Sequence, residues 1–307
     1  MKSAFYAVLI CLLADAGQGV CEIRIVTTTA DLAVIARAIG GDRVEVKSIA
    51  RGYQDPHYVQ AKPSYMRLVN RADLLVYTGL QLEVGWLPLL IEGGRNRAVV
   101  SGARGNLDAA RGIEVLEVPE GEVDRTMGDI HPEGNPHYML DPRNGLQVGA
   151  TLAGRLAELA PDDAEVFADN LEKFREDLRR RIAIWEHRAA AFRVKRVVAY
   201  HRQWEYLASW LGLEIIGYVE NRPGIPPSPR HLSALIEQMG RIDVGVILCA
   251  NFVDPATAKR VANRADAHIL TLPITPGGEE GVETYADLFE AIIDRLEESL
   301  AGAKETL

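Results

Sequence analysis

Three of the seven histidines lie where proteins commonly place metal ligands. His57 and His137 each follow a proline in a turn-rich segment, and His201 directly follows an apolar run that predicts a β-strand. A proline fixes the local backbone and so restricts the direction of the imidazole that follows it. Imidazole nitrogen is a preferred ligand of Zn²⁺ and related transition metals. One Pro-His alone is typical of a surface histidine, but two Pro-His turns and a histidine at the end of a predicted strand in one chain predict a metal site.

The other histidines are expected to lie in ordinary structural or solvated positions. His187 falls within a predicted long helix, His231 at the start of a predicted helix and His268 at the start of a predicted strand. His131 is intermediate, because it lies in a loop-like segment six residues before His137.

The elements around these histidines alternate between strands and helices. The predicted strands are residues 23–29, 44–49, 74–77 and 98–100 in the first half, and 196–200, 214–218, 243–248 and 268–272 in the second. Asp31 and Ser64 are typical N-cap residues for the first two predicted helices. Strands that alternate with helices indicate parallel sheets with right-handed crossovers. We therefore predict an α/β fold of two lobes, each with a parallel sheet flanked by helices.

A long helix is predicted between the two halves. From Asp162 to about Ala191 the chain contains neither proline nor glycine, and apolar residues recur every three or four positions. A coiled-coil segment and a rod that joins two lobes both fit this pattern, and the polar Asn170 in a single apolar stripe favours the rod. The predicted domains are an N-terminal lobe at residues 22–160, a linking helix at 161–191 and a C-terminal lobe at 192–307.

The three candidate histidines belong to both halves of the chain. His57 and His137 precede the predicted long helix, whereas His201 follows it. Strand ends in open α/β sheets face the crevice in which ligands bind. A site that uses all three histidines would therefore lie between the lobes.

The N-terminus predicts export. Lys2 precedes an apolar run of eleven residues, Ala4 to Ala14. Such a run is shorter than the ~20 residues that cross a membrane, but it is typical of a secretory signal. We expect residues 1–21 to be removed and the protein to be periplasmic. A lipid anchor at Cys21 is the less favoured alternative, because Val20 before it is not a small residue.

Composition excludes several classes of protein. The 307 residues carry a net charge of −9, which argues against binding to nucleic acid or anionic lipid. Seven histidines and only three cysteines exclude a disulfide-stapled scaffold and a four-cysteine zinc module.

Several longer blocks resemble a known family. They are IVTTTADLAVIARAIGG, GYQDPHYVQAKPSYMRLVNRADLLVYTG followed by GWLP, GNPHYMLDP, and VVAYHRQWEYLASWLGLE followed by GYVENRPGIPPSP. Their order and spacing resemble the zinc/manganese-binding substrate-binding proteins of ATP-driven (ABC) metal importers, the cluster A-I family, over residues 22–307. The resemblance implies two α/β lobes joined by one long helix. It also implies that His57, His137 and His201 are three ligands of one metal ion.

The fourth ligand position departs from the family pattern. Many members place an aspartate after a strand of the second lobe, where this chain has Leu272. Water, Glu279, Glu280 and Glu220 are the alternatives. Zinc-specific relatives often carry a His- and acid-rich loop at residues 113–136. Here that loop has seven acidic residues but His131 as its single histidine, so we expect a solvated acidic loop, and whether His131 assists metal capture stays open.

The ligand types favour zinc. Three neutral imidazoles suit Zn²⁺ better than Mn²⁺, which prefers oxygen ligands; Mn²⁺ is the alternative, and Cu and Ni stay open on affinity alone. The resemblance implies a monomer that captures the ion and delivers it to an ABC permease in the membrane. An adhesin or host-interaction protein on the same fold is the second reading. A zinc-dependent hydrolase is the third, and because HExxH and GxSxG motifs are absent we expect no enzyme and name no catalytic residue.

Overall fold

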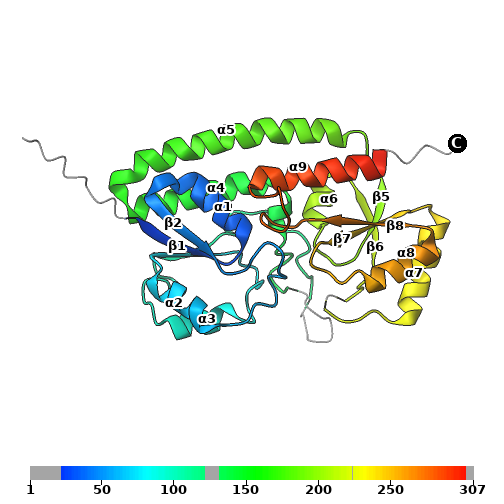
Figure 1. The fold of residues 1–307 in the computed structure, drawn as a ribbon, viewed down its shortest axis with the longest axis horizontal. Coiled ribbons are helices and arrows are strands. Elements are labelled where there is room, and N and C mark those ends of the chain that lie inside the picture. Colours follow the sequence, from blue (N-terminus) through cyan, green and yellow to red (C-terminus); the bar gives the residue numbers. More distant parts are fainter. Residues whose placement is uncertain (1–21, 122–130, 223, 302–307) are drawn as a thin grey trace, which may run out of the picture.

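Two parallel four-stranded sheets, each flanked by helices, form the core of the protein (Figure 1). The structure, a computed structural model, describes residues 22–121, 131–222 and 224–301. The predicted α/β fold class is confirmed.

The first sheet has the strand order β2-β1-β3-β4, and all neighbours are parallel. Ile25 and Leu75 are buried in its two central strands, as expected for a parallel sheet that helices cover on both faces. Its elements are β1 (Ile23–Thr27), α1 (Ala30–Gly40), β2 (Val44–Ser48), α2 (Pro63–Arg71), β3 (Leu74–Tyr77), α3 (Leu87–Gly94) and β4 (Asn106–Asp108).

The second sheet repeats this order as β6-β5-β7-β8, again with parallel neighbours. The central strand β7 is buried along its whole length. The elements are β5 (Arg196–Ala199), α6 (Glu205–Leu211), β6 (Glu214–Tyr218), α7 (Pro229–Arg241), β7 (Val246–Ala250), α8 (Ala256–Ala265) and β8 (His268–Leu272).

The predicted long helix is confirmed as α5 (Ala164–Ala189), which follows α4 (Pro142–Leu159). Its 26 residues correspond to about 39 Å, and it runs along both halves of the molecule (Figure 1). Its buried stripe packs against α4 and α1 in the first half and against α9 (Tyr285–Leu296) in the second. The apolar stripe of α5 therefore packs against other helices of the same chain, as expected for a rod that joins two lobes. The Asn170 side chain donates to the Ile39 carbonyl at 3.1 Å, which explains a polar residue in this stripe.

The helix α9 connects the second half to the first. Thr284 caps it with a reciprocal capping box that includes Asp287. Tyr285 is buried, and its hydroxyl donates to the carbonyl of Met139 at 2.7 Å. Met139 lies two residues after His137, so this helix helps to hold a first-half segment near the predicted site.

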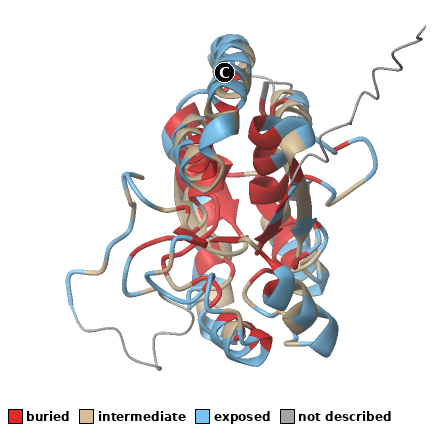
Figure 2. Ribbon diagram, turned by 90° about the vertical axis from the view of Figure 1, so that its left-hand side faces the viewer, coloured by how far each residue is buried: buried red, intermediate tan, exposed pale blue. Residues whose placement is uncertain are grey.

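Burial follows the layers of the fold. Buried residues lie on the inner faces of the helices and in the strands, whereas the outer faces are exposed (Figure 2). Among the described residues, no helix combines the length and the apolar character needed to cross a membrane. The predicted signal peptide at residues 1–21, with Cys21, lies outside the described residues. The limits of the predicted lobes stay a prediction.

Three local predictions are wrong. Residues 98–100 form a turn rather than the fourth strand, because Val99 is buried against a core cluster without joining the sheet. The helix α2 begins at Pro63 after an extended Lys62, so Ser64 lies inside the first turn and is not its cap. Similarly, Thr29 occupies the N-cap position of α1, and Asp31 lies in its first turn.

Replacement of Tyr285 by phenylalanine tests the link between α9 and the first half. The variant leaves the Met139 carbonyl without this donor, so we expect the free energy of unfolding to fall by about 1 to 2 kcal/mol. Urea unfolding at 25 °C measures the change. Tyr53→Phe, at a half-exposed side chain, is the control and should change stability by less than about 0.5 kcal/mol. Equal stability of Tyr285→Phe and the unmodified protein would contradict the assigned contact.

Candidate metal centre

His57 lies in the loop that follows β2. A carboxylate oxygen of Asp55 accepts hydrogen bonds from the backbone N–H of His57 at 2.9 Å and from its Nδ1 at 2.8 Å. The Trp86 indole donates to the carbonyl of Pro56 at 2.9 Å and so fixes the loop on the core. Burial alone would raise the pKa of Asp55, but the hydrogen bonds from His57 lower it below its ordinary value. A charged Asp55 keeps the proton on Nδ1 and leaves the lone pair on Nε2.

His137 precedes a short 3-10 helix at Tyr138–Leu140. Its backbone N–H donates to the side-chain oxygen of Asn135 at 3.0 Å. The Tyr138 hydroxyl donates to the carbonyl of Thr78 at 2.8 Å, which anchors the turn behind β3. Desolvation, followed by the nearby imidazoles of His57 and His201, holds the pKa of His137 well below its usual value. The ring is therefore neutral at pH 7, as a metal ligand must be.

His201 comes two residues after the last residue of β5. Its Nδ1 lies 3.1 Å from a carboxylate oxygen of Glu220, which follows the neighbouring strand β6. The Glu220 backbone N–H donates to the carbonyl of Tyr200 at 2.9 Å, so the two strand ends are held together. This carboxylate orients the imidazole in the same way that Asp55 orients His57.

The structure brings the three predicted histidines together. One ligand atom from each of His57, His137 and His201 lies within 4.8 Å of those of the other two. The ring centroids are 5.2 Å apart for His57 and His137, 5.9 Å for His57 and His201, and 6.0 Å for His137 and His201. The first two rings come from the first half of the fold and the third from the second half. At this spacing, one nitrogen of each ring can bind the same metal ion.

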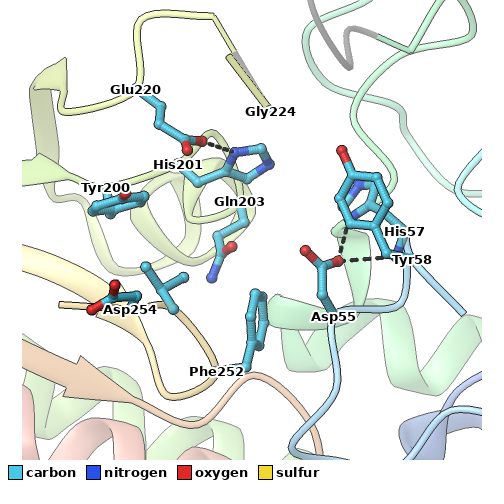
Figure 3. A pocket seen from close by; sticks show the side chains of 11 residues that line it. Asp55, His57, Tyr58, Tyr200, His201, Gln203, Glu220, Gly224, Phe252 and Asp254 are labelled. Atoms are coloured by element: carbon cyan, nitrogen blue, oxygen red, sulfur yellow. Dashed lines mark hydrogen bonds and ion pairs between the residues drawn. The ribbon is translucent and has the colours of Figure 1, made fainter. Parts of the chain in front are cut away.

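A cavity of about 310 Å³ lies beside these rings. Figure 3 shows His57 and His201 on opposite sides of it, with Asp55 and Glu220 bound to them. The cavity is larger than a single ion requires, so water and further side chains have access to the rings that line it.

The proposed alternatives for a fourth ligand lie in different places. Glu279 pairs with Arg295, with two oxygen–nitrogen distances of 2.5 and 3.2 Å. Glu280 is exposed, and neither glutamate lines the cavity. Leu272 is buried at the end of β8, where it offers no side-chain donor. Glu220 lines the cavity, but its carboxylate is engaged with His201.

The remaining histidines lie away from the site, except for one. His187 is exposed on α5, His231 lies 2.8 Å from the carbonyl of Tyr218, and His268 bonds to the Ser299 hydroxyl at 2.7 Å. His131, in contrast, reaches the site: its Nε2 lies 3.3 Å from Nε2 of His57.

The residues that orient the imidazole rings were not identified from the sequence. Asp55 and Asn135 each stand two residues before a histidine, and each accepts a hydrogen bond from that histidine's backbone N–H. The repeated pattern Asx-Pro-His was the available signal, because a side-chain oxygen of Asp or Asn commonly bonds the backbone two residues on.

Asn135 also connects the two halves. Its side-chain amide donates to Glu117 at 2.9 Å and to the carbonyl of Arg202 at 3.1 Å. The backbone carbonyl of Asn135 accepts a hydrogen bond from the Tyr206 hydroxyl at 2.9 Å. Arg202 lies just before α6 and Tyr206 within it, so the segment before His137 is tied directly to the region that carries His201.

Glu205 is the half-buried acid of this connection. Desolvation, followed by repulsion from Glu117, raises its pKa from 4.5 to about 7. One carboxylate oxygen lies 3.3 Å from the Asn135 amide nitrogen. The folded protein therefore holds a proton at Glu205 more tightly than the unfolded chain does. The stability that this group contributes is full below about pH 4.5 and is lost as the pH rises through about 7.

Comparison with known proteins assigns this two-sheet protein, with its cluster of histidines between the halves, to a family. Residues 25–299 match the family described as zinc-uptake complex component A periplasmic, ZnuA. The chain belongs to this family, and the resemblance found in the sequence is confirmed.

Individual relatives agree in both sequence and fold. The manganese ABC transporter substrate-binding lipoprotein PsaA of Streptococcus pneumoniae is 23% identical over 289 residues, which cover 91% of this chain and 90% of PsaA. The metal ABC transporter substrate-binding lipoprotein SsaB of Streptococcus sanguinis is 25% identical over 295 residues, covering 91% of this chain and 90% of SsaB.

Solved structures share the architecture. A zinc-bound deletion mutant of ZnuA aligns with a TM-score of 0.77 at 22% identity, over 92% of this chain and all of that chain. The manganese-bound periplasmic metal-binding protein of Candidatus Liberibacter asiaticus aligns with a TM-score of 0.75 at 20% identity, over 91% and 100% of the two chains.

Replacement of Glu205 by glutamine tests the raised pKa of this half-buried acid. The free energy of unfolding of the unmodified protein should fall between pH 5 and pH 8 as Glu205 loses its proton. Because glutamine does not titrate, the fall in the variant should be smaller by about 1 to 2 kcal/mol. Urea unfolding of metal-free protein at both pH values measures the difference. Glu237→Gln, at an exposed side chain of α7, serves as control. The same pH dependence in Glu205→Gln and the unmodified protein would show that Glu205 does not titrate as assigned.

Proposed function

We propose that this chain captures Zn²⁺, in preference to Mn²⁺, between its two halves and delivers it to the membrane permease of an ABC importer. The single observation that carries the proposal is the convergence of His57, His137 and His201 in a member of a metal-uptake family. In this proposal the three imidazoles are the metal ligands. The ion is the transported substrate and not a catalytic cofactor.

The ligand chemistry supports zinc. All three proposed ligand atoms are imidazole nitrogens, whereas Mn²⁺ favours carboxylate and other oxygen ligands. The two carboxylates closest to the rings, those of Asp55 and Glu220, bond to the imidazoles. Such bonds orient the rings and fix which ring nitrogen carries the proton. The relatives' names include both zinc and manganese, so the choice between the metals is argued from this donor set.

The cellular setting follows from the family and the N-terminus. We infer that the protein acts outside the cytoplasmic membrane as a periplasmic monomer, with residues 1–21 as its removed signal peptide. An anchor at Cys21 is the alternative, because several relatives are named lipoproteins. The proposed lobes are residues 22–160 and 192–307, joined by the helical segment 161–191.

Release is proposed to require a small movement. Both α5 and α9 pack across the two halves, and Tyr285 of α9 bonds to the segment after His137. A continuous helix of 26 residues resists a large hinge rotation. A slight separation of His201 from the other two rings is enough to break the site, because metal–nitrogen bonds tolerate little stretching.

The site is tested by changing each of His57, His137 and His201 to alanine. Each variant should bind zinc more weakly than the unmodified chain, by more than the 10- to 100-fold typical of residues that only hydrogen-bond a ligand. Elemental analysis and competition with a chromophoric chelator measure content and affinity. His187→Ala, which removes an exposed imidazole from α5, is the control.

Two outcomes would contradict the proposal. Stoichiometric zinc of unchanged affinity in all three variants would refute the site. Tighter binding of Mn²⁺ than of Zn²⁺ by the unmodified chain would refute the zinc preference while leaving metal capture intact.

A further inference from the structure

A zinc ion held by three histidines has one coordination position left for water or a further side chain, and this inference rests on the function proposed above. Zinc held by protein ligands is typically four-coordinate and tetrahedral. The three histidines supply three donors. Leu272 is buried and offers no side-chain donor, and Glu279 is paired with Arg295. Glu220 is engaged on the far nitrogen of His201.

His131 presents an imidazole at the distance that a shared tetrahedral ion would require. Its Nε2 lies 3.3 Å from Nε2 of His57, and the ring centroids are 5.3 Å apart. Two Zn–N bonds of about 2.0–2.1 Å at the tetrahedral angle place their nitrogens about 3.3–3.4 Å apart. Because Asp55 holds the proton on Nδ1 of His57, the nitrogen that faces His131 is the one with the free lone pair.

The turn that carries His131 is attached to the rest of the site. The carbonyl of His131 accepts from the backbone N–H of Gly134 at 3.1 Å. Gly134 has a φ of +104°, and a Cβ there would lie 2.3 Å from a methyl of Val115, so the turn packs closely on that segment. Gln81 donates to Glu133 at 3.1 Å, which ties the turn to the loop after β3.

We propose that His131 is the fourth metal ligand, filling the coordination position that His57, His137 and His201 leave open. The ligand atoms already within 4.8 Å of one another are those of His57, His137 and His201. His131 is not in this group, so the proposal requires a movement of its ring that brings Nε2, now 3.3 Å from Nε2 of His57, within bonding distance of the ion. A shell of four neutral imidazoles offers no oxygen ligand, and this strengthens the preference for zinc over manganese.

An alternative role for His131 makes the opposite prediction. If its ring only exchanges a hydrogen bond with Nε2 of His57, it competes with the metal for the lone pair of His57. Its removal would then leave the zinc affinity unchanged or raise it. The direction of the change therefore separates a ligand from a hydrogen-bond partner.

The experiment compares His131→Ala with His187→Ala in the full chain. Zinc affinity is measured by chelator competition, and the geometry is read from the visible spectrum of the Co²⁺-loaded protein. His131→Ala should bind zinc more weakly by more than the 10- to 100-fold typical of residues that only hydrogen-bond a ligand. It should also shift the Co²⁺ bands, because water oxygen replaces a nitrogen, and added imidazole should restore them. His187→Ala should match the unmodified chain in both measurements.

Unchanged or tighter zinc binding by His131→Ala, with an unchanged Co²⁺ spectrum, would overturn the assignment. The result is separable from failure of the proposed function. If the alanine variants of His57, His137 and His201 lose zinc while His131→Ala does not, only the fourth ligand is wrong. If all four variants keep zinc, the proposed site itself is wrong.

Discussion

The candidate site depends on imidazole rings that are held with one nitrogen protonated and the other directed at a common point. A free histidine on a loop samples many directions and either tautomer, so three of them would not form a site by proximity alone. Here Asp55 fixes His57 and Glu220 orients His201 through their Nδ1 atoms. Burial keeps His137 neutral. The carboxylates thus act on the rings, and in the proposed site the metal position is left to nitrogen donors.

The fold makes this convergence across two separate sheets. Each sheet is parallel, so its strand ends point in one direction and the loops that follow them gather at one edge. The long helix α5 and the bridging helix α9 hold the two halves together on one side of the molecule (Figure 1). On the site itself, Asn135 connects the turn before His137 to Arg202 and Tyr206. The two halves are therefore positioned both by helices and by a polar contact beside the rings.

Much of this arrangement could be predicted from local sequence patterns. Alternating strands and helices give the sheets, and the long stretch without proline or glycine gives α5. The three histidines stand out because they follow prolines or a strand. The prediction of a strand at residues 98–100 was wrong because three apolar residues fit a buried turn as well as a strand.

The contacts between distant residues could not be predicted in the same way. His131 and His57 are 74 positions apart, and their approach depends on how the turn at Gly134 packs on Val115. The burial of Glu205 likewise depends on packing between the halves, which no local pattern encodes. The repeated Asx-Pro-His pattern is the exception, since a short-range turn rule would have identified Asp55 and Asn135 from the sequence.

The most direct test of the central claim is a crystal structure of the zinc-loaded protein with anomalous diffraction measured on both sides of the zinc absorption edge. One strong zinc peak is expected between the two halves, about 2.0–2.1 Å from a ring nitrogen of each of His57, His137 and His201. A zinc peak elsewhere on the chain, with these three rings bound to no ion, would contradict it.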